Sequence, residues 1–284
     1  MSIPKIEVLN AAQKNRGQYE ILVNGVRYQL DRVTSCLNGI PKPALAYAQA
    51  NEAAYGAMDS ALADPEGFVR DAKNNREELK KKLAGAAFPK WKRRAALGSY
   101  VHELIEMHIL EAGRKPLVPE GVDGAEAQAM YDQFIAWEDY YKPEYLATEI
   151  QCVNLTHKYA GTADILAVVD GKTMILDIKT TRRGSDGGPG VYMEQGAQLA
   201  AYKHAEFLFD GRAGVTEVMP EVDGTAVIWI GTDGFELAPF HDGPELFELF
   251  LAAGSVHRAM QSKDKNSAGG PWWRSAEIVR RAEA

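Results

Sequence analysis

Apolar and polar positions follow a helical period over most of the first 141 residues and a strand-like alternation after them. The exception is a short hairpin predicted over 19–30, with its turn at Asn24-Gly25. The helical pattern then predicts four helices, over 41–58, 64–83, 94–112 and 123–141, with a break at 85–89. Glycine and proline at the boundaries, such as Gly113 and Pro143, support these limits.

Three runs rich in β-branched residues follow, over 146–153, 159–169 and 173–178, with turns at Asn154 and Asp170-Gly171. They predict an antiparallel meander. After a loop over 182–190, we expect a helix over 191–209, strands over 225–230 and 235–239, and a last helix over 244–261.

This order of elements predicts an α+β fold with a mixed central sheet. It also suggests three parts. A hairpin and helical region (1–93) packs on the core or leads a ligand into it, a core spans 94–262, and a C-terminal tail (263–284) is flexible or docked.

Composition limits the kind of metal site that the chain can build. Its two cysteines, Cys36 and Cys152, exclude a disulfide framework, a four-thiolate zinc site and an iron–sulfur cluster within one chain. Any metal would therefore be held by oxygen and imidazole ligands. No apolar run approaches the roughly 20 residues of a membrane span, and 1–16 has no secretory pattern, so we expect a cytoplasmic protein.

Charge is unevenly distributed along the chain. The formal net charge of −7 argues against a nucleic-acid partner at first sight. Between residues 73 and 94, however, nine basic residues face only Glu77 and Glu78, which leaves 23 basic and 37 acidic residues elsewhere. The basic residues are Lys73, Arg76, Lys80, Lys81, Lys82, Lys90, Lys92, Arg93 and Arg94. This segment is a candidate phosphate-binding surface, or a solvated helix face followed by a basic loop.

Two aspartates and a lysine share one face of the predicted meander. The turn at Asp170-Gly171 places Asp164 and Asp177 opposite each other, and Lys179 points to the same side as Asp177. A divalent cation between the carboxylates would offset the cost of burying them, and the lysine would assist phosphodiester hydrolysis. The alternative is a cross-strand salt-bridge cluster without metal.

Two further pairs have the i, i+4 spacing of a shared helix face. His102 is a candidate metal ligand with Glu106 one turn away. Gln198 and Tyr202 would hydrogen-bond a phosphate, a base or a catalytic group. The alternatives are a solvent-facing His–Glu pair and a polar edge on an apolar helix.

The ordered set G-x-x-x-H, G-x-x-D, D-x-K and Q-x-x-x-Y, from Gly98 to Tyr202, resembles the PD-(D/E)xK nuclease superfamily. It is most similar to the RecB-like exonuclease branch, in a phage-type form without the iron–sulfur cluster. The resemblance implies a restriction-endonuclease-like core and one or two Mg²⁺ or Mn²⁺ ions. The implied metal ligands are His102, Asp164, Asp177 and the backbone carbonyl of Ile178, with Lys179 as the catalytic lysine.

The same resemblance gives Gln198 and Tyr202 a supporting role. Glu149 falls where relatives often carry an acidic residue, and it is either a further ligand through water or, the preferred interpretation, a strand-edge charge. Candidate DNA contacts are Thr180, Thr181 and Arg182 after the catalytic strand, and Lys90, Trp91, Lys92 and Arg93 before the His102 helix. We expect Trp272-Trp273 to anchor the tail.

These features predict a metal-dependent DNA exonuclease of recombination, repair or replication that acts on DNA ends or single strands. A homo-oligomer, or a recombination or single-strand-binding partner protein, is compatible with this function. The alternatives are a dimeric structure-specific endonuclease or resolvase, and a non-catalytic DNA-binding module of the same fold.

Overall fold

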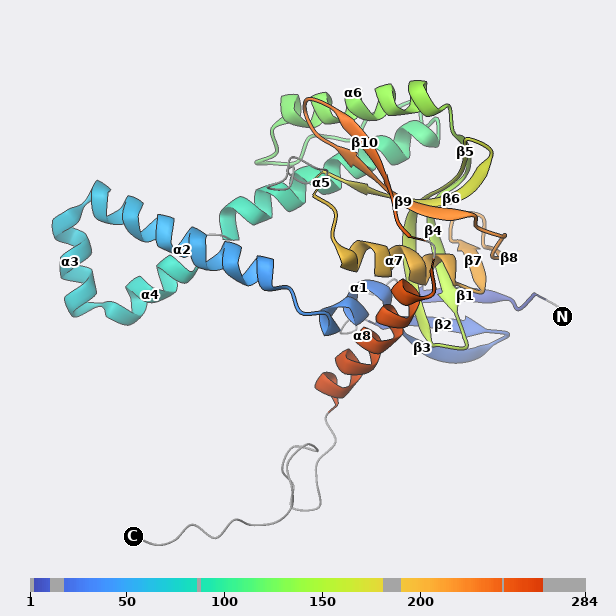
Figure 1. Ribbon diagram of the computed structural model, residues 1–284, viewed down its shortest axis with the longest axis horizontal. Helices are drawn as coiled ribbons and strands as arrows, with labels where there is room; N and C mark the ends of the chain where they lie inside the picture. Colours follow the sequence, from blue (N-terminus) through green and yellow to red (C-terminus); the bar gives the residue numbers. More distant parts are fainter. Residues whose placement is uncertain (1–2, 11–17, 86–87, 181–189, 242, 263–284) are drawn as a thin grey trace, which may run out of the picture.

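A mixed β-sheet between two layers of helices forms the body of the protein in the computed structural model (Figure 1), which describes residues 3–10, 18–85, 88–180, 190–241 and 243–262. The strands are β1 (Ile6–Asn10), β2 (Gln18–Val23), β3 (Val26–Arg32), β4 (Glu144–Asn154), β5 (Tyr159–Val169), β6 (Lys172–Lys179), β7 (Phe207–Asp210), β8 (Val215–Val218), β9 (Gly224–Ile230) and β10 (Phe235–Pro239). The prediction of an α+β fold with a mixed sheet is confirmed.

The predicted meander forms the centre of the sheet. β4, β5 and β6 pair antiparallel in chain order, and β6 pairs parallel with β9, which gives the order β10-β9-β6-β5-β4-β7-β8. The N-terminal strands β1–β3 join the same sheet through a short parallel pairing of β3 with the start of β5. The sheet curls so that β1 approaches β8, where the Ile6 amide donates a hydrogen bond to Thr216 Oγ1 (3.2 Å).

The helices cover both faces of the sheet. α5 (Phe88–Ile109) and α6 (Gly124–Tyr141) pack on one face, and α1 (Val33–Cys36), the 3₁₀ turn η1 (Leu37–Gly39), α7 (Met193–Lys203) and α8 (Glu245–Gln261) pack on the other. Alternation along β6 separates the two cores, because Ile175 packs toward α7 and α8 whereas Leu176 and Ile178 pack toward α5 and α6. The site described below lies at the middle of β4 and β5 and at the C-terminal end of β6.

Three helices form an arm that projects from the body (Figure 1). α2 (Pro43–Ala63), α3 (Pro65–Asn74) and α4 (Arg76–Ala84) pack mainly on one another, and the chain then returns to the body through α5. The arm exposes large apolar side chains, among them Tyr47, Tyr55 and Leu62. Within the described residues, no helix combines the length and apolar character that a membrane span needs.

Several predicted boundaries are wrong for identifiable reasons. The helix predicted over 64–83 is two helices, because the chain turns at Asn75 between α3 and α4. α5 begins at Phe88, with Pro89 in its first turn, where proline is compatible with a helix. The helix predicted over 191–209 ends at Lys203, since Phe207–Asp210 forms β7 against β4. Strands β1 and β8 were not predicted, and the expected loop 182–190 and tail 263–284 lie almost entirely outside the described residues.

Candidate metal centre

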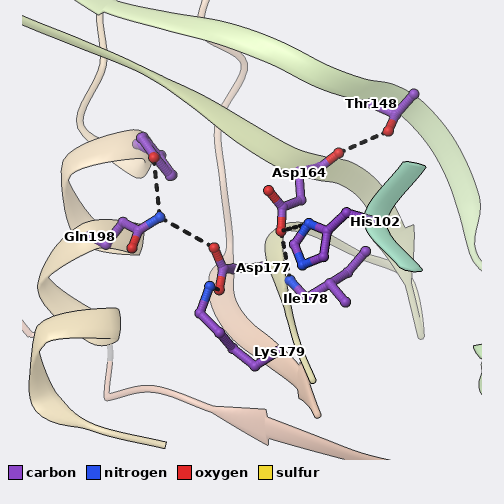
Figure 2. Close-up of polar contacts among 8 residues, drawn as sticks. His102, Thr148, Asp164, Asp177, Ile178, Lys179 and Gln198 are labelled. Atoms are coloured by element: carbon purple, nitrogen blue, oxygen red, sulfur yellow. Dashed lines mark hydrogen bonds and ion pairs between the residues drawn. The ribbon is translucent and has the colours of Figure 1, made fainter. Parts of the chain in front are cut away.

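Three potential metal ligands converge from three elements. His102 on α5, Glu149 on β4 and Asp164 on β5 each present a ligand atom, and these atoms all lie within 4.8 Å of one another. His102 Nδ1 is 3.4 Å from Asp164 Oδ2 (Figure 2). We call His102, Glu149 and Asp164 the metal triad.

Strand register brings the carboxylates of the site together. Thr148 pairs with Ile165 and Ile150 with Ala163, so Glu149 stands opposite Asp164. The ladder between β5 and β6 ends at the pair of Ile165 and Leu176, so Asp164 and Asp177 each lie one residue beyond its last pair.

Two hydrogen bonds hold Asp164 in place. Its carboxylate accepts from the Ile178 amide (2.8 Å), and its carbonyl accepts from Thr148 Oγ1 (2.9 Å; Figure 2). Asp164 is therefore anchored to both neighbouring strands, which gives the triad a rigid member.

Glu149 has an unusual backbone conformation for a strand residue. Its φ of 49° lies in the left-handed region, which costs about 1–3 kcal/mol for a residue other than glycine. Its pKa is raised to about 7 by burial and by the neighbouring carboxylates of Asp164 and Glu106, against the opposing effect of Arg212. The structure thus places its carboxylate within the cluster, whereas the preferred sequence interpretation was a strand-edge charge.

Asp177, which is buried, and Lys179, which is half-buried, form an ion pair beside the triad (Figure 2). Asp177 is only 2% exposed, and burial, followed by repulsion from Asp164, raises its pKa to about 6. Burial opposes the charge on Lys179, but Asp177 and Asp164 outweigh it and raise the lysine pKa. Lys179 is therefore a cation at neutral pH.

The predicted helix pair Gln198 and Tyr202 supports Asp177 from α7. Gln198 Nε2 donates to Asp177 Oδ1 (3.2 Å) and lies 3.2 Å from the Tyr202 hydroxyl (Figure 2). Burial and the nearby Asp177 raise the pKa of Tyr202 well above its usual value, so its hydroxyl stays protonated. These hydrogen bonds from Gln198 orient the Asp177 carboxylate, which in turn holds Lys179.

The cluster of three differs from the ligand set that the resemblance implies. Among the described residues, Glu149 rather than Asp177 completes the group of three ligands within 4.8 Å, because the oxygens of Asp177 face Lys179 and Gln198. Ile178 enters the site through its amide, which donates to Asp164.

Two glycines of the motifs allow close approach at the site. A Cβ at Gly161 would lie 2.6 Å from Tyr202 Cε1, and a Cβ at Gly98 would lie 3.0 Å from Thr180 Oγ1. Any side chain at Gly161 would displace Tyr202. The contact at Gly98 brings Thr180, a predicted DNA contact, against α5 one turn before His102.

Glu106 lies one turn after His102, as predicted, and forms an ion pair with Arg212 from the turn between β7 and β8. No sequence motif marks Arg212, and the sequence separation of 106 positions between the partners hides their proximity. The pair places a second cation beside the triad.

The formal charge of the cluster suits a divalent cation. The cluster contains four carboxylates and two cations, so its formal charge is −2 when His102 is neutral. The carboxylates are those of Glu106, Glu149, Asp164 and Asp177, and the cations are Lys179 and Arg212. Burial, together with this repulsion, raises the pKa values of Glu149 and Asp177. Carboxylate oxygens are the ligands that suit Mg²⁺ and Mn²⁺, so Glu149 and Asp164 fit such an ion.

The other predicted DNA contacts lie apart from the triad or outside the described residues. Trp91 contacts Phe88 edge-on near the start of α5 (ring centroids 6.4 Å apart), and Lys92 and Arg93 are exposed. Thr181, Arg182 and the side chain of Lys90 are not part of the described structure, and neither are Trp272 and Trp273, which we expect to anchor the tail.

Comparisons with known proteins assign no family to the chain. No family model matches the chain, and no curated protein matches it. Among solved structures, the crystal structure of SSO0001 is similar over 59% of this chain and 74% of its own, at 13% identity and a TM-score of 0.31. This level of similarity carries no argument about function.

Proposed function

We propose that this protein is a Mg²⁺- or Mn²⁺-dependent deoxyribonuclease with a PD-(D/E)xK core. The observation that carries the proposal is the metal triad next to the ion pair of buried Asp177 and half-buried Lys179. Burial and, after it, repulsion from Asp164 and Glu106 raise the pKa of Glu149 to about 7. Such perturbed carboxyls are typical of functional sites.

Each residue has a distinct task in hydrolysis. His102, Glu149 and Asp164 would hold the cation, which supplies charge neutralisation at the phosphate and a water of lowered pKa. The ammonium of Lys179 orients the attacking water and stabilises the negative charge that develops on the phosphate. Asp177, held by Gln198, fixes the position of that ammonium.

The resemblance extends this proposal to exonuclease action that leaves 5′-phosphate and 3′-hydroxyl products. DNA ends or single strands are then the substrate, and an oligomer or a recombination partner would act with this chain. A structure-specific endonuclease and a non-catalytic DNA-binding module are the competing outcomes.

Digestion of end-labelled linear duplex, linear single-stranded and covalently closed circular DNA tests the proposal. The experiment compares wild type, Lys179→Ala and Lys172→Ala with Mg²⁺, Mn²⁺ or EDTA. Lys172 is a matched control because it is an exposed lysine on the same strand β6.

We expect wild type and Lys172→Ala to degrade only the linear DNA, with metal, and Lys179→Ala to lose at least a hundredfold in rate, the order of effect of removing one preorganised charge. Cleavage of the circle would favour the endonuclease. DNA binding without any cleavage would refute the nuclease and support the non-catalytic DNA-binding module.

A further inference from the structure

Arg212 is a second cation at the site that the proposed hydrolysis does not use. It lies in the tight turn between β7 and β8. Asp210 Oδ1 accepts from the Arg212 amide (2.8 Å) and the Ala213 amide (3.2 Å), and the Asp210 carbonyl accepts from the Gly214 amide (2.7 Å). Gly214 closes the turn with a φ of 65°. The turn therefore presents Arg212 in a defined direction.

The order of strands places one cation on each side of the triad carboxylates. Across the sheet, β6 carries Lys179, β5 carries Asp164, β4 carries Glu149, and β7 leads into the turn with Arg212. Neighbouring strands are about 4.8 Å apart, so β6 and β7 are separated by roughly 14 Å. Arg212 thus stands beyond Glu149 on the flank away from Lys179.

The pair of Arg212 and Glu106 adds little to stability but suits an anion. The Arg212 side chain is 51% exposed, so solvent screens its ion pair with Glu106. Glu106 contacts one terminal amine, and the guanidinium carries further donors in a planar fork that matches phosphate oxygens. The exposed cation is ready to accept a ligand while Glu106 holds its position.

We propose that Arg212, positioned by Glu106, forms a subsite for a backbone phosphate of DNA next to the scissile phosphate. The ligand is the pair of non-bridging oxygens of one phosphodiester. Lys179 and the triad act on the scissile phosphate, and Arg212 binds the neighbouring phosphate on the β7 side. This inference rests on the proposed function and identifies a substrate-binding group within it.

The salt dependence of DNA binding tests the subsite without any need for cleavage. Fluorescence anisotropy in EDTA, with labelled single-stranded and duplex oligonucleotides, would compare wild type, Arg212→Ala, Arg212→Lys and Arg27→Ala across a salt titration. Arg27 is a matched control, because it is also an exposed arginine paired with a glutamate, Glu20, on the remote β2–β3 hairpin.

We expect Arg212→Ala to weaken binding about tenfold, as for loss of one charged hydrogen-bonded contact. It should also lower the slope of log K against log salt by about 0.7 for single strands and about 0.9 for duplex. Arg212→Lys should keep the slope, and Arg27→Ala should match wild type. With metal, Arg212→Ala should raise KM and leave kcat nearly unchanged, because the lost contact stabilises the bound substrate and the transition state equally.

A slope for Arg212→Ala equal to that of wild type would overturn the subsite, whether or not the wild type cuts DNA. A fall in kcat at constant KM would also overturn it, because Arg212 would then act on the scissile phosphate in the transition state. If the slope depends on Arg212 but wild type cuts no DNA, the nuclease proposal fails and the phosphate subsite stands.

Discussion

Glu149→Gln should stabilise the metal-free protein and abolish most of its stabilisation by metal. The substitution keeps the size of the side chain and the left-handed backbone at this position, so the strain is common to both proteins. It removes only the charge that burial, Asp164 and Glu106 disfavour. The expected result is opposite to that of most substitutions in a buried cluster.

The magnitude follows from the pKa of Glu149, which is about 7 in the folded protein against 4.5 ordinarily. The folded state binds this proton more tightly, so the contribution to stability is present below pH 4.5 and is lost as pH rises through 7. At about 1.4 kcal/mol for each pKa unit, the upper limit of the loss at pH 8 is about 3 kcal/mol. Solvent screening at this partly exposed carboxyl reduces the figure to about 1–2 kcal/mol.

Thermal unfolding at pH 4.5 and pH 8, with EDTA or Mn²⁺, measures this effect. In EDTA at pH 8 the variant should unfold about 2–8 °C above wild type, and the difference should nearly vanish at pH 4.5. Mn²⁺ at 100 times its Kd should stabilise wild type by about 2.7 kcal/mol and the variant far less. Glu144→Gln, an exposed change on the same strand, is the control.

Two results would refute this reasoning. One is a Tm for Glu149→Gln at or below that of wild type at pH 8 in EDTA. This result would show that the charge on Glu149 does not destabilise the metal-free protein. The other is an unchanged stabilisation by Mn²⁺, which would remove Glu149 from the metal triad.

Other expectations follow from the same structure. Gly161→Ala should cost about 1–3 kcal/mol in chemical denaturation and lower cleavage, because its Cβ would lie 2.6 Å from Tyr202; wild-type stability would contradict this. Mn²⁺ affinity, measured by calorimetry, should rise between about pH 6 and pH 8 as Glu149 ionises, and a flat profile would count against the triad. Cys36 and Cys152 should resist a thiol reagent until unfolding, because burial raises their pKa values to about 11 and about 12; fast labelling of the native protein would be the contrary result.

Much of the site could be predicted because it depends on local periodicity. The turn at Asp170-Gly171 sets the register of β5 and β6, whose last pair, Ile165 and Leu176, lies next to Asp164 and Asp177. The i, i+4 spacing on a helix puts Gln198 and Tyr202 within 3.2 Å of each other. In both cases one turn or one helix determines the geometry.

The rest depends on backbone conformation and on contacts between distant segments. Glu149 enters the metal triad with a φ of 49°, and no residue pattern marks that conformation. Arg212 reaches Glu106 only because β7 pairs with β4, and the apolar residues that form β7 also fit the end of a helix. Short edge strands such as β1 and β8 are paired by tertiary contacts that local propensity does not encode.

The most direct test of the metal centre is diffraction from a crystal soaked in Mn²⁺ and measured for anomalous scattering. We predict a peak between His102, Glu149 and Asp164, about 2.0–2.2 Å from their ligand atoms, and its loss in Asp164→Asn crystals. A crystal with no peak at the triad, at Mn²⁺ concentrations that support cleavage, would contradict the account.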